Sequence, residues 1–225
     1  MNNELRTKNG FSLMEVLLAI GILSIGMIFI AGVFPAAIYL MTVSTEQSIG
    51  AAAADEAFAK IRIYDVNWAD PNFAAGRMVR VEGNIFEFAY PSTIQNPDDK
   101  QYYWSALCRK TGLTDVQVTV FVCRKIGSYL NRPVPVLVGV SKIGNNMLQI
   151  TNAGQATLIN DGYTVVDNVT GQIYRVLERS STIPINIVLD RPWQGGPTGA
   201  VWVVPPPAGG GRYPCVAVYQ KVIRF

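Results

Sequence analysis

An uncharged run of 30 residues, Val16 to Thr45, constrains this chain more than any other feature of its sequence. As an α-helix the run would extend over roughly 45 Å, more than the ~30 Å hydrocarbon core of a membrane. Arg6 and Lys8 precede the run, and basic residues beside an apolar segment are typical of its cytoplasmic end. We therefore predict one membrane span over about residues 13–41, with the N-terminus in the cytoplasm and the rest of the chain across the membrane.

Two other interpretations of the apolar run are weaker. A buried core helix is rarely so long and so uniformly apolar. A secretory signal also combines a basic start with an apolar segment, but that segment has about 7–15 residues. The small residues Ala36 and Ala37, which could mark a cleavage site, come late in the run and follow Pro35.

We also expect Pro35 to kink or melt the helix near residues 31–35, because proline removes a helical hydrogen bond.

The acidic residue Glu15 lies at the start of the apolar segment. Placing a carboxylate in lipid costs on the order of 2.5–3.5 kcal/mol, so a partner is expected. The alternative is a helix-start residue that stays hydrated near the headgroups. The surrounding residues, from Lys8 to Ile20, read KNGFSLMEVLLAI. This segment resembles the processing and methylation motif of type IV prepilins and type II secretion pseudopilins, and the segment from Ile22 to Gly26 resembles the minor subunits of that family.

The resemblance implies a role for three residues. In that family a prepilin peptidase cuts after the glycine, so residues 1–10 would be the leader and Gly10 its last residue. Phe11 would then become the N-methylated first residue of the mature chain. Glu15 would act in assembly, because its carboxylate can neutralise the Phe11 amine of a neighbouring subunit, and two charges that are costly in an apolar core would be matched. The implied partners are prepilin peptidase, other pilin or pseudopilin subunits contacted through the N-terminal helix, and the bacterial inner membrane.

Beyond the span, the helical pattern continues but becomes amphipathic. Ile49, Ala53, Ala57 and Ile61 recur at i+4 spacing and predict one buried face. Glu56 and Lys60 are spaced for an ion pair on the helix. We expect one helix over residues 11–66, with its second part packed against a head domain formed by residues 67–225.

The head reads as mostly β-structure. Residues 115–123 alternate between apolar and polar side chains, which is the period of a strand. Further strands are predicted at 135–140, 162–166, 172–177, 185–189, 201–204 and 215–223. A long helix followed by a run of strands predicts an α+β fold with an antiparallel sheet, as the pilin resemblance also implies. Residues 142–193 could form a small β subdomain inserted into this head.

The absence of histidine excludes Ser-His and Cys-His catalysis and histidine-ligated metals. Three cysteines cannot supply a four-thiolate zinc site, but an oxidising compartment would permit a disulfide. A disulfide between Cys108 and Cys123 would close the shortest loop and leave Cys215 free. Alternatively, all three cysteines are small buried hydrophobic residues.

No cofactor and no metal site is expected, although three acidic or amide residues offer oxygens of the kind that Ca²⁺ binds: Asn96, Asp98 and Asp99.

A DNA-binding patch is also not expected. The net charge is only +3, too small for an electrostatic nucleic-acid binder. Two basic pairs beside aromatic residues, Arg109-Lys110 and Arg124-Lys125, fit a solvated sheet edge better.

Together with the resemblance, the sequence predicts a structural pilin-like subunit without catalytic residues. A membrane-anchored binding module or adhesin is the alternative, and a hydrolase would need paired carboxylates or a Ser-Lys pair formed by folding.

Overall fold

One helix, α1 (Leu13–Tyr64), opens the computed structural model and contains 52 residues. At ~1.5 Å per residue it is about 78 Å long. The structure describes residues 11–225 except 65, 84, 97–98 and 127–131. These residues form two compact units, a first that ends at Glu46 and a second that runs from Gln47 to Phe225. The boundary between the units therefore falls inside α1.

Pro35 lies inside α1 without interrupting it. The expected melted stretch near residues 31–35 is not found, and helical structure continues from Leu13 to Tyr64. Proline removes a single hydrogen bond, and helix formation is cooperative. The long helical segments on both sides therefore carry the helix through this one defect.

The second unit contains a five-stranded antiparallel sheet in the order β1-β3-β4-β11, with β2 also paired to β3. Its long strands are β3 (Tyr102–Lys110), β4 (Asp115–Arg124) and β11 (Cys215–Arg224). The short strands β1 (Val79–Arg80) and β2 (Ala89–Tyr90) lie beside β3. Two short helices precede the long strands, α2 (Pro71–Ala74) and the 3-10 helix η1 (Ile85–Phe88).

The two faces of this sheet bury different sets of residues. The predicted alternation in β4 is confirmed, because Val116, Val118, Val120 and Val122 share one core cluster with α1 residues such as Ala57. The opposite face carries a second cluster, whose members come from the sheet, from β7 (Thr164–Asp167) and from residues next to β1 and β10 (Thr198–Val203): Met78, Leu107, Phe121, Cys123, Val166 and Val204. The sheet is thus covered on both sides within the second unit.

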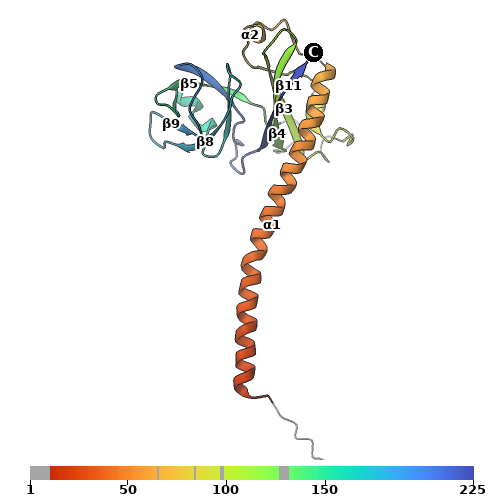
Figure 1. The fold of residues 1–225 in the computed structure, drawn as a ribbon, viewed down its shortest axis with the longest axis vertical. Helices are drawn as coiled ribbons and strands as arrows, with labels where there is room; N and C mark the ends of the chain where they lie inside the picture. The colour runs from red at the N-terminus through yellow and green to blue at the C-terminus, as the bar shows by residue number, and fades with distance from the viewer. Residues whose placement is uncertain (1–10, 65, 84, 97–98, 127–131) are drawn as a thin grey trace, which may run out of the picture. The chain divides into compact units, whose positions relative to one another are not determined.

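A closed six-stranded antiparallel barrel is inserted between β4 and β11 (Figure 1). Its strand order is β10-β5-β6-β9-β8-β7, and β10 closes the circle by pairing with both β5 and β7. The strands are β5 (Val136–Lys142), β6 (Met147–Ile150), β7 (Thr164–Asp167), β8 (Ile173–Arg179), β9 (Asn186–Leu189) and β10 (Thr198–Val203). The 3-10 helix η3 (Ala153–Leu158) lies between β6 and β7. The barrel has its own core, in which Tyr174, Ile187 and Val201 are buried.

The predicted α+β class is therefore confirmed, with a long apolar helix followed by antiparallel sheets. Each predicted strand overlaps an observed one, but β1, β2, β3 and β6 were not predicted. Residues 142–193, the segment proposed as a subdomain, lie within residues 136–203, which contain the barrel strands.

Candidate functional site

The start of α1 is fixed by Ser12. Its carbonyl oxygen accepts hydrogen bonds from the N–H groups of Glu15 (3.0 Å) and Val16 (3.2 Å), and its hydroxyl oxygen accepts one from the N–H of Met14 at 3.3 Å. Ser12 is thus the N-cap, and Glu15 occupies the third helical position, as in the Ser-x-x-Glu pattern of a capping box. A carboxylate in the first turn also interacts favourably with the helix dipole. The sequence contained this signal, but the cap was not predicted.

Phe11 and Glu15 are both exposed, and Phe11 exposes 82% of its surface. Phe11 lies two residues before the first residue of α1, and Glu15 lies in the first turn. Gly10 lies outside the described residues. Within the first unit, neither Phe11 nor Glu15 is covered by protein, so both are accessible to a membrane or to another chain.

The first part of α1 exposes apolar side chains on all its faces. Between Val16 and Met41, every large apolar side chain is more than 40% exposed. Among the residues that the structure describes, α1 is the one helix long and apolar enough to cross a membrane. A helix that is apolar all round needs a nonaqueous surrounding. Lipid, or an apolar surface of another chain, can supply one.

The second part of α1, residues 47–64, is amphipathic and packs into the head. The predicted stripe is confirmed, since Ala53, Ala57 and Ile61 are buried together with Phe58. The small residues allow close approach: a Cβ atom added to Gly50 would lie 3.4 Å from the hydroxyl of Tyr219. That hydroxyl donates a hydrogen bond to the carbonyl of Gln47 at 3.3 Å.

Polar contacts fix the same part of α1 to the head. Lys60 Nζ lies 2.9 Å from the Glu56 carboxylate, which confirms the predicted i,i+4 pair, and donates to the carbonyl of Glu87 at 2.8 Å. The Ser92 hydroxyl also donates a hydrogen bond to the Glu56 carboxylate. Burial acts to raise the pKa of Glu56, but the hydrogen bonds from Ser92 and Lys60 and the charge of Lys60 outweigh it, so that the pKa is lowered.

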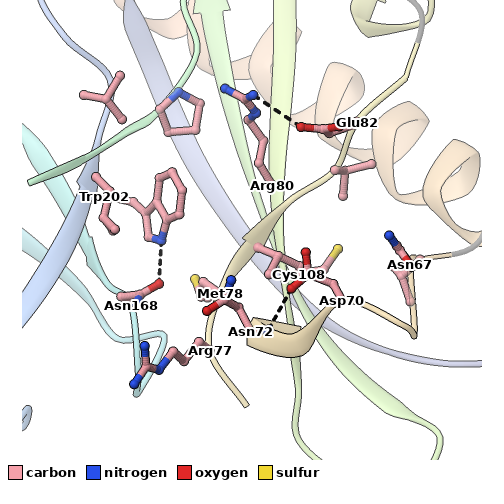
Figure 2. A pocket seen from close by; sticks show the side chains of 16 residues that line it. Asn67, Asp70, Asn72, Arg77, Met78, Arg80, Glu82, Cys108, Asn168 and Trp202 are labelled. Atoms are coloured by element: carbon pink, nitrogen blue, oxygen red, sulfur yellow. Dashed lines mark hydrogen bonds and ion pairs between the residues drawn. The ribbon is translucent and has the colours of Figure 1, made fainter. Parts of the chain in front are cut away.

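A cavity of about 830 Å³ lies between the sheet and the barrel. Figure 2 shows Arg80 and Cys108 on its sheet side and Trp202 and Asn168 on its barrel side. The Trp202 indole donates to the Asn168 side-chain oxygen at 2.9 Å, and Arg80 pairs with Glu82 at 3.5 Å. The cavity thus has an apolar wall and several polar groups, as ligand sites often do.

The arginines of the two basic pairs, Arg109 and Arg124, make structural contacts. Arg109 donates to Gln117 at 2.8 Å and to the carbonyl of Val169 in the barrel at 2.7 Å. Arg124 donates to the carbonyl of Tyr213 at 2.9 Å. The Arg109 bond joins the sheet to the barrel, and the Arg124 bond joins β4 to the segment before β11. Both guanidinium groups thus bind protein atoms.

The possible calcium ligands do not form a described site. Asp98 lies outside the described residues, and the Asn96 amide donates to the Asp99 carboxylate at 3.1 Å. Across the described residues, no group of three or more Cys, Asp or Glu side chains is placed to hold a metal ion.

The structure keeps Cys108 and Cys123, the pair considered for a disulfide, apart from each other. All three cysteines are free thiols, and the two lie on opposite faces of the sheet: Cys108 belongs to the cluster shared with α1, and Cys123 to the cluster shared with the barrel. The reason is the strand register, which pairs Cys108 with Val118 and not with Cys123. Burial raises the pKa of the Cys108 thiol to about 12, so this cysteine behaves as a small hydrophobic residue.

Comparison with known proteins identifies the N-terminal segment alone. The family model of the prokaryotic N-terminal methylation motif matches residues 5–31. The chain therefore carries the type IV prepilin-like signal. No curated protein and no solved structure matches the chain.

Proposed function

We propose that this chain is a structural pilin-like subunit, assembled into a type IV pilus or a type II secretion pseudopilus as a minor component. A prepilin peptidase removes residues 1–10 after Gly10, Phe11 is N-methylated, and the apolar part of α1 anchors the subunit in the bacterial inner membrane. The head then lies on the extracytoplasmic side. The match to the methylation motif at residues 5–31 is the observation that carries this proposal.

In this role the apolar part of α1 is used twice. Before assembly, the exposed apolar side chains between Val16 and Met41 are solvated by lipid. After assembly, the same surface packs against equivalent helices of other subunits. The Glu15 carboxylate pairs with the Phe11 amine of a neighbour, so two charges that are each costly in an apolar surrounding are neutralised together. The helix needs no enzymatic chemistry for this role.

Processing is tested by substituting the glycine before the cleavage site. We expect Gly10→Leu to leave an uncleaved precursor in the membrane, whereas Gly21→Leu, a matched change inside the apolar run, should be cleaved normally. N-terminal sequencing and intact mass of the purified chain give the result. Wild-type chain that still begins at Met1, or normal maturation of Gly10→Leu, would contradict the proposal.

Assembly is tested at Glu15. We expect Glu15→Gln to insert and to be cleaved, but to be lost from isolated filaments by at least tenfold. Ser24→Ala is a suitable control, because Ser24 is another polar residue of the same helix and its hydroxyl bonds only to the Ile20 carbonyl one turn away, at 2.8 Å. Normal filament incorporation of Glu15→Gln would exclude the proposed charge pairing.

A membrane-anchored binding module or adhesin is the second candidate. The cavity of about 830 Å³ between sheet and barrel favours it, since a concave surface with a few polar groups is suited to a ligand. This role needs neither cleavage nor assembly. A chain that is stable in the membrane with residues 1–10 attached would favour it over the filament subunit.

A further inference from the structure

The structure assigns a different cysteine pair, Cys123 with Cys215, as a disulfide that forms once the head meets an oxidising compartment. The two residues are direct partners in the register of β4 and β11. Both thiols are free in the structure. The inference rests on the proposed function only in that the head must leave the cytoplasm.

The backbone places these two residues at a spacing suited to a disulfide. The N–H of Arg124 donates to the carbonyl of Pro214 at 2.8 Å. Because this bond joins the residue after Cys123 to the residue before Cys215, the two cysteines form a pair that is not itself hydrogen-bonded. Such pairs have Cα atoms about 4.5 Å apart, with their side chains close together. Disulfides span Cα separations of about 4.4–6.8 Å.

The side chains also face each other. The two residues are register partners, and the nearby Cys215 side chain together with burial raises the pKa of the Cys123 thiol. The Cys215 thiol donates to the carbonyl of Ala217 at 3.6 Å. Cys215 is only partly buried, whereas Cys123 is completely buried. Cys215 is therefore the thiol that an oxidant can reach, and Cys123 is the one that resolves the intermediate.

The reaction is a thiol–disulfide exchange with an external disulfide, either a disulfide oxidoreductase or oxidised glutathione. The Cys215 sulfur, after losing its proton, attacks one sulfur of the oxidant and releases the other as a thiol. The Cys123 sulfur then loses its proton, attacks the Cys215 sulfur of the mixed disulfide and releases the second thiol. Two thiols of this chain are oxidised, and one disulfide of the oxidant is reduced to two thiols.

The location of the pair gives the bond a clear role. Cys123 is the penultimate residue of β4, where the chain leaves the sheet for the barrel, and Cys215 is the first residue of β11, where it returns. The bond would join the two stems of the insertion and enclose the whole barrel in one covalent loop. Cross-links that close long loops restrict the unfolded chain most strongly.

The experiment uses the full-length chain in detergent, incubated in glutathione buffer and mapped by mass spectrometry without reduction. We expect one linked peptide that joins Cys123 to Cys215 and is lighter by two hydrogen atoms, with Cys108 alkylated only after unfolding. Reduction should lower the Tm of the head by about 5–10 °C. That shift should vanish in Cys215→Ala and persist in Cys108→Ala. Free thiols at Cys123 and Cys215 under oxidising conditions, or a link to Cys108, would overturn the assignment.

Protein isolated from its own membrane separates this inference from the proposed function. Thiols are alkylated at lysis, and the N-terminus is sequenced in the same sample. A chain that begins at Phe11 with Cys123 and Cys215 both alkylated overturns the disulfide and leaves the pilin-like role intact. A chain that begins at Met1 with the two cysteines linked supports the disulfide and rejects the processing.

Discussion

The two parts of α1 belong to one continuous helix but satisfy opposite requirements. Residues 16–45 carry no charge and expose their large apolar side chains on every face, whereas residues 47–64 bury one stripe and expose charged groups elsewhere. Ile25, in the first part, is 57% exposed, and Ala57, in the second, is fully buried. Exposure therefore has a different meaning in each part. In the second part it marks contact with water, and in the first it marks an apolar surface that requires a nonaqueous surrounding.

This difference shows how a single secondary structure can join two environments. The second part gains its stability from the head, through the cluster that Ala53, Phe58 and Ile61 form with the sheet. The large apolar side chains of the first part are exposed between Val16 and Met41. The persistence of this part depends on local hydrogen bonds and on the surrounding medium, so substitutions at equally exposed positions should differ sharply between the two parts.

The largest effect should come from placing a charge at exposed positions of both parts. We expect Ile25→Arg to cost about 2.5–3.5 kcal/mol of membrane insertion, because the guanidinium must enter lipid; this corresponds to a loss of roughly 100-fold in the inserted fraction. Ala52→Arg, at an exposed position of the second part, should have no effect. Membrane fractionation of both variants gives the measurement. Equal insertion of the two would remove the distinction drawn between the parts.

The next effect is overpacking of the buried stripe. Ala57→Leu adds three carbon atoms where the structure has no exposed surface, and we expect it to destabilise the head by about 1–3 kcal/mol. Ala52→Leu makes the same change on the exposed face of that part and should be neutral. Urea unfolding followed by the tryptophan signal of the head compares them. Identical midpoints for the two variants would mean that this part of α1 does not pack as the structure has it.

A smaller effect, in the stabilising direction, is expected from glycine. Gly50→Ala removes a flexible residue from the helix interior, and the added Cβ would meet Tyr219 and Ala217 only at ordinary contact distances, 3.4 and 3.7 Å. We predict a gain of up to about 1 kcal/mol. Gly32→Ala, in the apolar part, has no atom within 4 Å of its added Cβ and should leave the Tm of the head unchanged. A loss of stability in Gly50→Ala would indicate tighter packing there.

The smallest effect concerns pH. The folded state lowers the pKa of Glu56, so this carboxylate stabilises the head above its unfolded pKa, and that contribution is lost as the pH falls through the folded value. We expect the Tm of the wild type to fall more steeply below about pH 4.5 than that of Glu56→Gln. Glu82→Gln, whose side chain is 82% exposed, is the control. Parallel curves for wild type and Glu56→Gln would contradict the assignment.

Much of the fold could be predicted because its signals are local. The 30-residue uncharged run, the i+4 stripe and the alternation in β4 each predicted an element that the structure contains. Strand β3 was missed because both of its faces are buried, at residues such as Trp104 and Leu107, and a strand buried on both sides shows no alternation. Closure of the barrel depends on β10 pairing with two strands distant in sequence, which no local pattern reveals.

The candidate site also has a part that could be predicted from the sequence and a part that could not. The motif from Lys8 to Ile20 could be predicted because it is a run of consecutive residues, and the family model of the methylation motif matches residues 5–31. The possible pair of Cys108 with Cys123 was suggested by loop length, whereas contact between strands is decided by register. The hairpin of β3 and β4 pairs Cys108 with Val118 and Cys123 with Tyr103. The cysteine beside Cys123 is Cys215, which enters the sheet much later in the chain.

The outermost position of β11 in its sheet has one more consequence. Its unpaired backbone groups could template a strand from a second molecule, whereas the circular barrel offers no comparable border. Concentrated preparations of the head should therefore self-associate along this strand. A proline or an additional lysine in β11, where the backbone N–H faces away from β4, would keep them dispersed.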